Sequence, residues 1–137
     1  MQLGMIGLGR MGGNMAQRLM RGGHQIVAYD RDAQTVHALA EKGAEAAANL
    51  EDVVHKLAKP RAVWVMLPAG AVTEGTVTRL AGILENGDTV IDGGNSFYKD
   101  DIRRAANLRN AGITYVDVGT SGGVWGLDRG YCMMIGG

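Results

Sequence analysis

Short apolar runs alternate with longer amphipathic segments along the whole chain. The apolar runs cover residues 3–8, 25–30, 62–67, 88–93, 113–118 and 131–136. Between them, apolar side chains recur at three- and four-residue spacing in residues 11–21, 33–42, 50–58, 71–85 and 97–111. The runs are typical of buried parallel strands, and the intervening segments are typical of helices that pack on a sheet. This alternation predicts one α/β domain over residues 1–137, with a doubly wound, mostly parallel sheet and right-handed crossovers.

Polar residues and glycines mark the ends of the predicted helices. Asp32 and Asn49 precede two of them and are expected to be N-caps, because their side chains can accept hydrogen bonds from the first-turn N–H groups. Gly22, Gly43 and Gly112 follow the last turns, where a residue free to leave the helical conformation is favoured. These boundaries support short, separate helices that each lead into a strand.

A glycine-rich stretch joins the first strand to the first helix. In the sequence GLGRMG, Gly7 allows a tight turn, Gly9 lets a pyrophosphate approach the backbone, and Gly12 lets the helix lie close to the sheet. Asp30 ends the second strand, 18 residues after Gly12, where a carboxylate can accept hydrogen bonds from the ribose hydroxyls of adenosine. Strand, glycines, helix and acid in this order predict a dinucleotide site on a Rossmann fold. Glycines that merely turn the chain are the alternative.

Two further turns lie at the carboxyl ends of predicted strands, the edge at which open sheets bind ligands. MLPAG, residues 66–70, fits a ligand contact and a plain turn equally well. In DGGNS, residues 92–96, the two glycines allow another group to approach the backbone closely, and the side chain of Asn95 offers both a hydrogen-bond donor and an acceptor. We therefore expect Asn95 to be functional, and we expect Ser96 to cap the helix that begins near Phe97.

A second glycine-rich loop follows the strand ITYVDV. Thr120, Ser121, Gly122 and Gly123 supply hydroxyls and unobstructed N–H groups, which can form a site for the oxygens of a carboxylate or a hydroxyl-rich substrate. A glycine-rich turn before the last strand explains the same residues. The pattern alone leaves both interpretations open.

Composition narrows the function classes. Fourteen basic residues balance fourteen acidic ones, so no net positive charge favours binding to nucleic acid or anionic lipid. Cys132 is the single cysteine, which excludes an internal disulfide and favours a cytoplasmic location. The chain shows no signal peptide and no run of 18 apolar residues, so we expect no secretion and no membrane association. The three histidines form no metal-binding pattern, and we expect no metal site.

Three longer stretches resemble a known family. MIGLGRMGGNMAQRL resembles the start of the β-hydroxyacid dehydrogenase superfamily. IDGGNSFYKDDIRRA and VGTSGGVWGLDRGYCMMIGG are similar to the decarboxylating 6-phosphogluconate dehydrogenases in particular, so the match covers essentially the whole chain. Common NADP-type members have an Asn-Arg-Thr-like sequence where this chain has Asp30, Arg31 and Asp32. The chain therefore looks more like the shorter branch that prefers NAD, with NADP the less favoured cofactor.

The resemblance implies roles for individual residues. It places the cofactor against Gly7, Leu8, Gly9, Arg10, Met11, Gly12, Asp30, Arg31, Leu67, Pro68, Ala69 and Asn95. It places the substrate, 6-phosphogluconate, against Asn95, Ser121, Gly122 and Gly123. The implied reaction is oxidation at C3, decarboxylation of the β-keto acid, and protonation of an enediol to ribulose 5-phosphate.

In the family, a lysine and a glutamate beyond the position of Gly137 act as base and acid, and an all-helical domain and a neighbouring subunit complete the site. We therefore expect this chain to lack catalytic residues, and the whole protein to form a homo-oligomer. Two other functions stay open: a sister hydroxyacid dehydrogenase or reductase acting on a smaller acid, and a nucleotide-sensing module without chemistry. The DGGNS sequence favours the 6-phosphogluconate enzyme over the sister enzyme.

Overall fold

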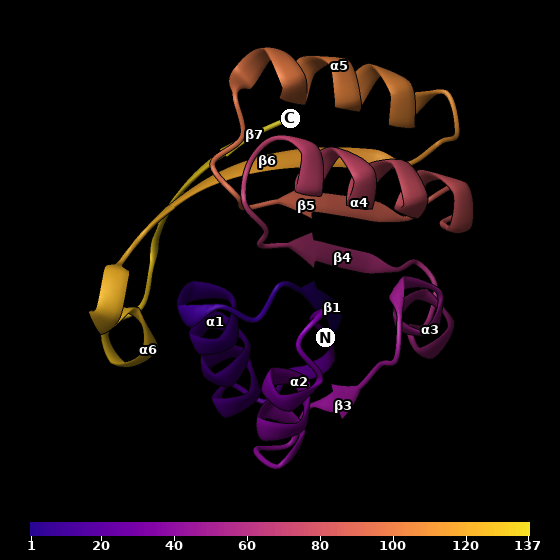
Figure 1. Ribbon diagram of the computed structural model, residues 1–137. Coiled ribbons are helices and arrows are strands. Elements are labelled where there is room, and N and C mark those ends of the chain that lie inside the picture. The colour runs from indigo at the N-terminus through magenta and orange to yellow at the C-terminus, as the bar shows by residue number, and fades with distance from the viewer.

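The computed structural model describes residues 1–137 as one α/β domain with a seven-stranded sheet (Figure 1). The strands are β1 (Gln2–Ile6), β2 (Gln25–Tyr29), β3 (Glu45–Ala46), β4 (Ala62–Val65), β5 (Thr89–Asp92), β6 (Thr114–Ser121) and β7 (Cys132–Gly136). The longer helices are α1 (Arg10–Arg21), α2 (Ala33–Ala40), α3 (Leu50–Lys56), α4 (Ala71–Ile83) and α5 (Tyr98–Arg109). None of the helices is long and apolar enough to cross a membrane.

The sheet is doubly wound, as the alternating pattern predicts. Its strand order is β3-β2-β1-β4-β5-β6-β7, and every pair except β6 with β7 is parallel. The chain starts in the middle of the sheet at β1, winds to one side through β2 and β3, and then crosses to β4 and continues outward (Figure 1). The strand order therefore reverses between β1 and β4, which is the position where open α/β sheets bind ligands.

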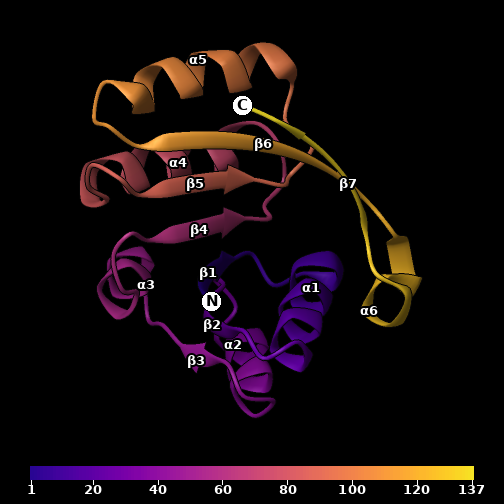
Figure 2. The ribbon, with the colours of Figure 1, turned by 180° about the vertical axis from the view of Figure 1, so that it is seen from behind.

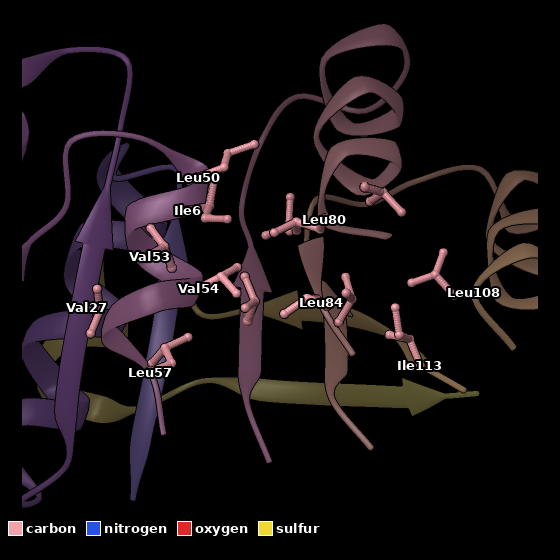
Figure 3. Close-up of a cluster of buried hydrophobic side chains, with 14 of the residues drawn as sticks. Ile6, Val27, Leu50, Val53, Val54, Leu57, Leu80, Leu84, Leu108 and Ile113 are labelled. Carbon is pink, nitrogen blue, oxygen red and sulfur yellow. The ribbon is translucent and has the colours of Figure 1, made fainter. Parts of the chain in front are cut away.

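Two apolar clusters hold the helices to opposite faces of the sheet. On one face, α3, α4 and α5 pack on Ile6, Val27, Val63, Val65 and Val90. The labelled side chains of this cluster, from Leu50 on α3 to Leu108 on α5, form one continuous layer over the strands (Figure 3). On the other face, α1 and α2 pack on a second cluster that contains Met5, Ile26 and Trp64.

Side-chain caps explain where two helices start. Asp32 accepts hydrogen bonds from the backbone N–H of Gln34 at 3.0 Å and from the hydroxyl of Thr35 at 3.1 Å. Asn49 accepts one from the N–H of Asp52 at 2.8 Å. Both predicted N-caps are therefore confirmed.

The last strand differs from its prediction. The run 131–136 suits a buried parallel strand, yet β7 is antiparallel to β6, and Cys132 to Ile135 are exposed. The connection from β6 contains only a 3-10 turn (Gly123–Trp125) and the one-turn helix α6 (Gly126–Arg129). A parallel return needs a crossover of a dozen or more residues, so this short connection reverses the chain. The two-residue edge strand β3 was also absent from the prediction.

The β6–β7 ribbon extends beyond the carboxyl ends of the other strands. Figure 2 shows it reaching past β4 and β5 to α6, which lies beside α1. The side chain of Arg18 on α1 donates hydrogen bonds to the carbonyl oxygens of Leu127 and Asp128 in α6 at 3.1 and 3.2 Å. Arg21 adds an ion pair with Asp128 at 3.1 Å. These contacts attach the tip of the ribbon to the helix that follows the first glycine-rich loop.

Candidate cofactor and substrate site

A cavity of about 750 Å³ opens at the carboxyl ends of the strands, beside the reversal point between β1 and β4. Of the residues expected to contact a cofactor, it is lined by Gly7, Leu8, Gly9, Asp30, Arg31, Leu67 and Pro68. Arg10, Met11, Gly12, Ala69 and Asn95 are not among its lining residues. The fold therefore brings three separate sequence motifs, at the ends of β1, β2 and β4, to one cavity.

The three glycines of the first loop meet different requirements. Gly7 has φ +92°, and a Cβ there would overlap the carbonyl oxygen of Met66. A Cβ at Gly12 would overlap the carbonyl oxygen of Gly7. Gly7 is therefore required for the loop to pass close to the end of β4, and Gly12 for α1 to lie close to that loop. A Cβ at Gly9 would meet no atom within 4 Å. Gly9 therefore faces open space, and a ligand can approach the backbone there.

The start of α1 has the properties of an anion site. Gly9 is its N-cap and supplies no side-chain hydrogen bond, and the first turn contains no acidic residue. The first-turn N–H groups of a helix lack intrahelical partners and lie at the positive end of the helix dipole. In a helix that starts at a cavity wall, these groups favour a phosphate.

The carboxylate of Asp30 is tied to the backbone by both oxygens. Its Oδ2 accepts a hydrogen bond from the N–H of Leu8 at 2.8 Å, and its Oδ1 accepts one from the N–H of Asp32 at 2.9 Å. Asp30 thus links the end of β2 to the glycine loop after β1. Each carboxylate oxygen can accept more than one hydrogen bond, so the group retains acceptor capacity toward the cavity.

The opposite wall of the cavity comes largely from α4. Ala71, Val72, Gly75, Thr76 and Arg79 of this helix line it, and Arg79 forms an ion pair with Glu51 of α3. The wall is fixed by Thr73, which is fully buried and donates a hydrogen bond to the carbonyl oxygen of Pro68 at 2.8 Å.

Sequence reasoning missed the α4 lining residues, because they belong to no glycine or acid motif. It also missed Tyr29, Thr35 and Leu50 in the cavity wall. Tyr29, at the end of β2, and Ala71 and Val72, at the start of α4, could have been found from their position beside a strand end.

The DGGNS turn is held against the end of β4. A Cβ at Gly93 would overlap the indole Nε1 of Trp64, and a Cβ at Gly94 would overlap the carbonyl oxygen of Leu67. The close approach predicted for these glycines is therefore made to the chain itself. Asn95 has φ +59° and is exposed, so its amide is presented to the solvent at this edge.

The prediction for Ser96 is wrong. The N-cap of α5 is Phe97, which makes no side-chain capping bond. The hydroxyl of Ser96 instead donates a hydrogen bond back to Oδ2 of Asp92 at 2.5 Å. The buried carboxylate at the end of β5 is a stronger acceptor partner than any group at the helix start, because a charged acceptor strengthens the bond.

The second glycine-rich loop also differs from its prediction. Thr120 and Ser121 were expected to follow the strand, but β6 continues to Ser121, which pairs with Cys132 of β7. Gly122 packs against the ring of Tyr131, which a Cβ would approach to 2.6 Å. Ser121 and Gly123 are exposed, and Gly123 has φ +50°. Ser121, Gly122 and Gly123 do not line the cavity at the glycine loop.

Comparisons with known proteins agree with this architecture. Residues 2–137 match the protein family described as the NAD binding domain of 6-phosphogluconate dehydrogenase. A protein from Haloferax volcanii named "6-phosphogluconate dehydrogenase, NAD(+)-dependent, decarboxylating" is 43% identical over 137 residues. The match covers 100% of this chain and 45% of that protein, so the chain spans less than half of this relative's length.

Solved structures give the same result. Plasmodium falciparum 6-phosphogluconate dehydrogenase, described with its cofactor NADP+ and its substrate 6-phosphogluconate, has a TM-score of 0.90 and 29% identity over 100% of this chain and 31% of that one. Mycobacterium tuberculosis 3-hydroxyisobutyrate dehydrogenase has a TM-score of 0.88 and 24% identity over 99% of this chain and 46% of that one, which shows the shared fold alone. The fold, the glycine fingerprint and the family match together show that this chain belongs to the 6-phosphogluconate dehydrogenase family, as its NAD-binding domain.

Proposed function

We propose that this chain is the cofactor-binding part of a decarboxylating 6-phosphogluconate dehydrogenase that uses NAD. The observation that carries the proposal is the cavity at the strand reversal point, where the glycine loop, Asp30 and the α4 wall meet. The open space at Gly9 and the uncapped start of α1 suit a pyrophosphate, and Asp30 suits the adenosine ribose. NAD, when bound, supplies the acceptor for a hydride from the substrate.

The choice of NAD over NADP rests on Asp30. An adenosine 2′-phosphate would bring a second negative charge to a carboxylate that already lines the cavity. Arg31 lines the same cavity and offsets part of this repulsion. The name of the Haloferax volcanii relative, NAD(+)-dependent, supports the same choice.

The proposed substrate contacts are Asn95 and the turn from Ser121 to Gly123. Both lie at carboxyl ends of neighbouring strands, β5 and β6, and both present polar groups to the solvent. Asn95 can donate to and accept from a hydroxyl, and Ser121 with the following N–H groups can bind a carboxylate. In this role they orient the sugar acid, and the proton transfers require a base and an acid from elsewhere.

The chain by itself is expected to bind cofactor without turnover. No lysine or histidine lines the cofactor cavity. Lys59 pairs with Glu85, and Lys56 pairs with Asp52 at 3.2 Å, both away from the cavity. From the family resemblance, the base, the acid and the phosphate contacts are proposed to lie in an all-helical domain of the whole enzyme, which is also proposed to form a homo-oligomer.

Calorimetric titration with NAD and NADP, alongside an absorbance assay for NADH, tests the proposal. We expect NAD to bind more tightly than NADP, and no NADH to form when 6-phosphogluconate is added to this chain. Absence of NAD binding would refute the cofactor site, and steady NADH formation would reveal a base within the 137 residues. The same assay on the whole protein, with 3-hydroxyisobutyrate as a second substrate, separates the sister dehydrogenase from the 6-phosphogluconate enzyme. Binding without turnover of either acid by the whole protein would favour a nucleotide sensor.

A further inference from the structure

Asn95 stands in a backbone conformation that needs support from its surroundings. It is the only residue other than glycine with a positive φ, at +59°. This left-handed region is sparsely populated by residues with a side chain, although asparagine tolerates it better than most. Because Asn95 is exposed, the support must come from the residues that flank it and lie beneath it.

The buried carboxylate of Asp92 holds the turn on both sides of Asn95. Its Oδ1 accepts a hydrogen bond from the N–H of Gly94 at 2.9 Å, and its Oδ2 accepts one from the hydroxyl of Ser96 at 2.5 Å. Asp92 itself is only 2% exposed. One side chain at the end of β5 therefore fixes the residue before Asn95 and the residue after it.

Arg104 connects this turn to the wall of the cofactor cavity. Its Nη1 donates to the hydroxyl of Ser96 at 3.1 Å and lies 3.4 Å from Oδ2 of Asp92. Its Nε donates to Oε2 of Glu74 on α4 at 2.7 Å. Glu74 directly precedes Gly75 and Thr76, which line the cavity. A single guanidinium thus spans from the Asn95 turn to the α4 wall.

Asp92 and Arg104 of this network are buried, and Glu74 is partly exposed. Hydrogen bonds from Arg103 and Arg104 lower the pKa of Glu74 to about 2, so this carboxylate stays ionised at neutral pH. Arg104 is 2% exposed, and the hydroxyl oxygen of Tyr115 lies 2.7 Å from Oδ1 of Asp101 and 2.9 Å from Oδ2 of Asp92. Burial of ion pairs is a poor source of stability, because loss of hydration offsets most of the attraction. The network is better explained by the geometry that it imposes on the turn.

We propose that Asp92, Ser96 and Arg104 are positioning residues, which preset Asn95 for the substrate by anchoring its turn to β5 and α4. This inference rests on the proposed function, because it takes Asn95 as a substrate contact. It predicts that disturbing the network weakens substrate use far more than cofactor binding.

Arg103 and Arg104 offer a matched pair of variants. Arg103 also binds Glu74, through hydrogen bonds of 2.7 and 3.0 Å, but its other partner is Asp100 and it does not reach the turn. Arg104→Lys disturbs the contacts to both α4 and the turn, whereas Arg103→Lys disturbs the contacts to Glu74 and Asp100 only. Ser96→Ala removes the hydroxyl contact alone, and Ser96→Thr restores a hydroxyl.

The variants are compared in the polypeptide that joins this domain to the rest of the dehydrogenase. Steady-state kinetics give kcat and KM for 6-phosphogluconate, and calorimetry gives the Kd for NAD. Hydrogen exchange at the Gly94 amide, measured by NMR in the 137-residue chain, reports the turn without any turnover. Thermal unfolding checks that each variant remains folded.

We expect Ser96→Ala and Arg104→Lys to lower kcat/KM by about 10-fold or more, since misplacing a substrate contact by about 1 Å can cost about 100-fold. The Kd for NAD should stay within about twofold, Gly94 should exchange faster, and Arg103→Lys and Ser96→Thr should resemble wild type. If Ser96→Ala shows wild-type kinetics and wild-type exchange at Gly94, this inference is overturned and the proposed function still stands. A wild-type protein that binds no NAD or does not oxidise 6-phosphogluconate would overturn the proposed function, and this inference with it.

Discussion

Replacing Asp30 by asparagine should change which dinucleotide the chain prefers. The substitution removes one negative charge from the cavity and keeps the size of the side chain. The Asn oxygen can still accept the hydrogen bond that Leu8 N–H makes to Oδ2 at 2.8 Å, so the glycine loop should keep its position, whereas the bond from the N–H of Asp32 to Oδ1 is lost to the amide group. The loss of that bond acts on both dinucleotides, so the change in their relative affinity is expected to be mainly electrostatic.

The size of the effect follows from Coulomb's law. Two unit charges about 4 Å apart repel by about 4 kcal/mol at an effective dielectric constant of about 20. Asp30 is half-buried, and the guanidinium of Arg31 lies in the same cavity, so solvent and the neighbouring cation reduce this value. A remaining repulsion of about 1.4 to 2.8 kcal/mol corresponds to about a 10- to 100-fold change in the ratio of the NADP and NAD affinities.

Calorimetric titration of NAD and NADP into wild type, Asp30→Asn and Asp32→Asn measures this ratio. Asp32 is the matched control, because it lines the same cavity but is committed to the N-cap of α2. We expect Asp30→Asn to raise the relative affinity for NADP, and the effect should shrink at high salt as the charges are screened. An unchanged ratio in Asp30→Asn, or an equal change in both variants, would show that Asp30 does not select the cofactor.

Three other predictions test the site and the fold. In the whole enzyme, Asn95→Ala and Ser121→Ala should each lower kcat/KM for 6-phosphogluconate by about 10-fold or more, while the Kd for NAD changes by less than about twofold. Unaltered kinetics in both variants would show that these residues only form turns. Gly12→Ala should destabilise the domain by about 1–3 kcal/mol in urea unfolding, because its Cβ would overlap the Gly7 carbonyl oxygen. Gly9→Ala, whose Cβ would meet no atom within 4 Å, should unfold like wild type and weaken only the binding of NAD. Burial opposes ionisation of Asp88, but hydrogen bonds from the N–H groups of Glu85 and Arg61, together with the Arg61 guanidinium, lower the pKa of its carboxyl group below 3.8. The stability that this carboxylate contributes is therefore present above pH 3.8, and it is lost as the pH falls through the lower pKa of the folded state. Asp88→Asn should cost about 3–5 kcal/mol at neutral pH and flatten this acid dependence, and a variant as stable as wild type would contradict the assignment.

Local patterns in the sequence were enough to predict the class of fold and several of the residues that line the cavity at the strand reversal point. The alternation of apolar runs and amphipathic segments placed all five longer helices and six of the strands, because burial on a sheet imposes these periods on the chain. Gly7, Gly9 and Asp30 were recognisable because a turn, a helix start and a strand end each demand a particular residue type at a particular spacing. The caps Asp32 and Asn49 are equally local.

The remaining features depend on contacts between residues far apart in the sequence. Gly93 and Gly94 are required by Trp64 and Leu67 at the end of β4, and no pattern within DGGNS distinguishes this contact from contact with a ligand. Ser96 lies where a helix cap is expected, yet Asp92 and Arg104 bind its hydroxyl.

The segments that become strands and helices, and the loop suited to a pyrophosphate, follow from short-range sterics and periodic burial, so the amino-acid sequence is enough to predict them. Three features emerge only when distant elements pack together: the second cavity wall formed by α4, the return of β7 along β6, and the burial of Arg104 between α4 and the Asn95 turn. A charged residue in an amphipathic helix has the same local signature whether it faces solvent or a buried carboxylate. Its environment is set by the elements packed against it, and these come from distant parts of the chain.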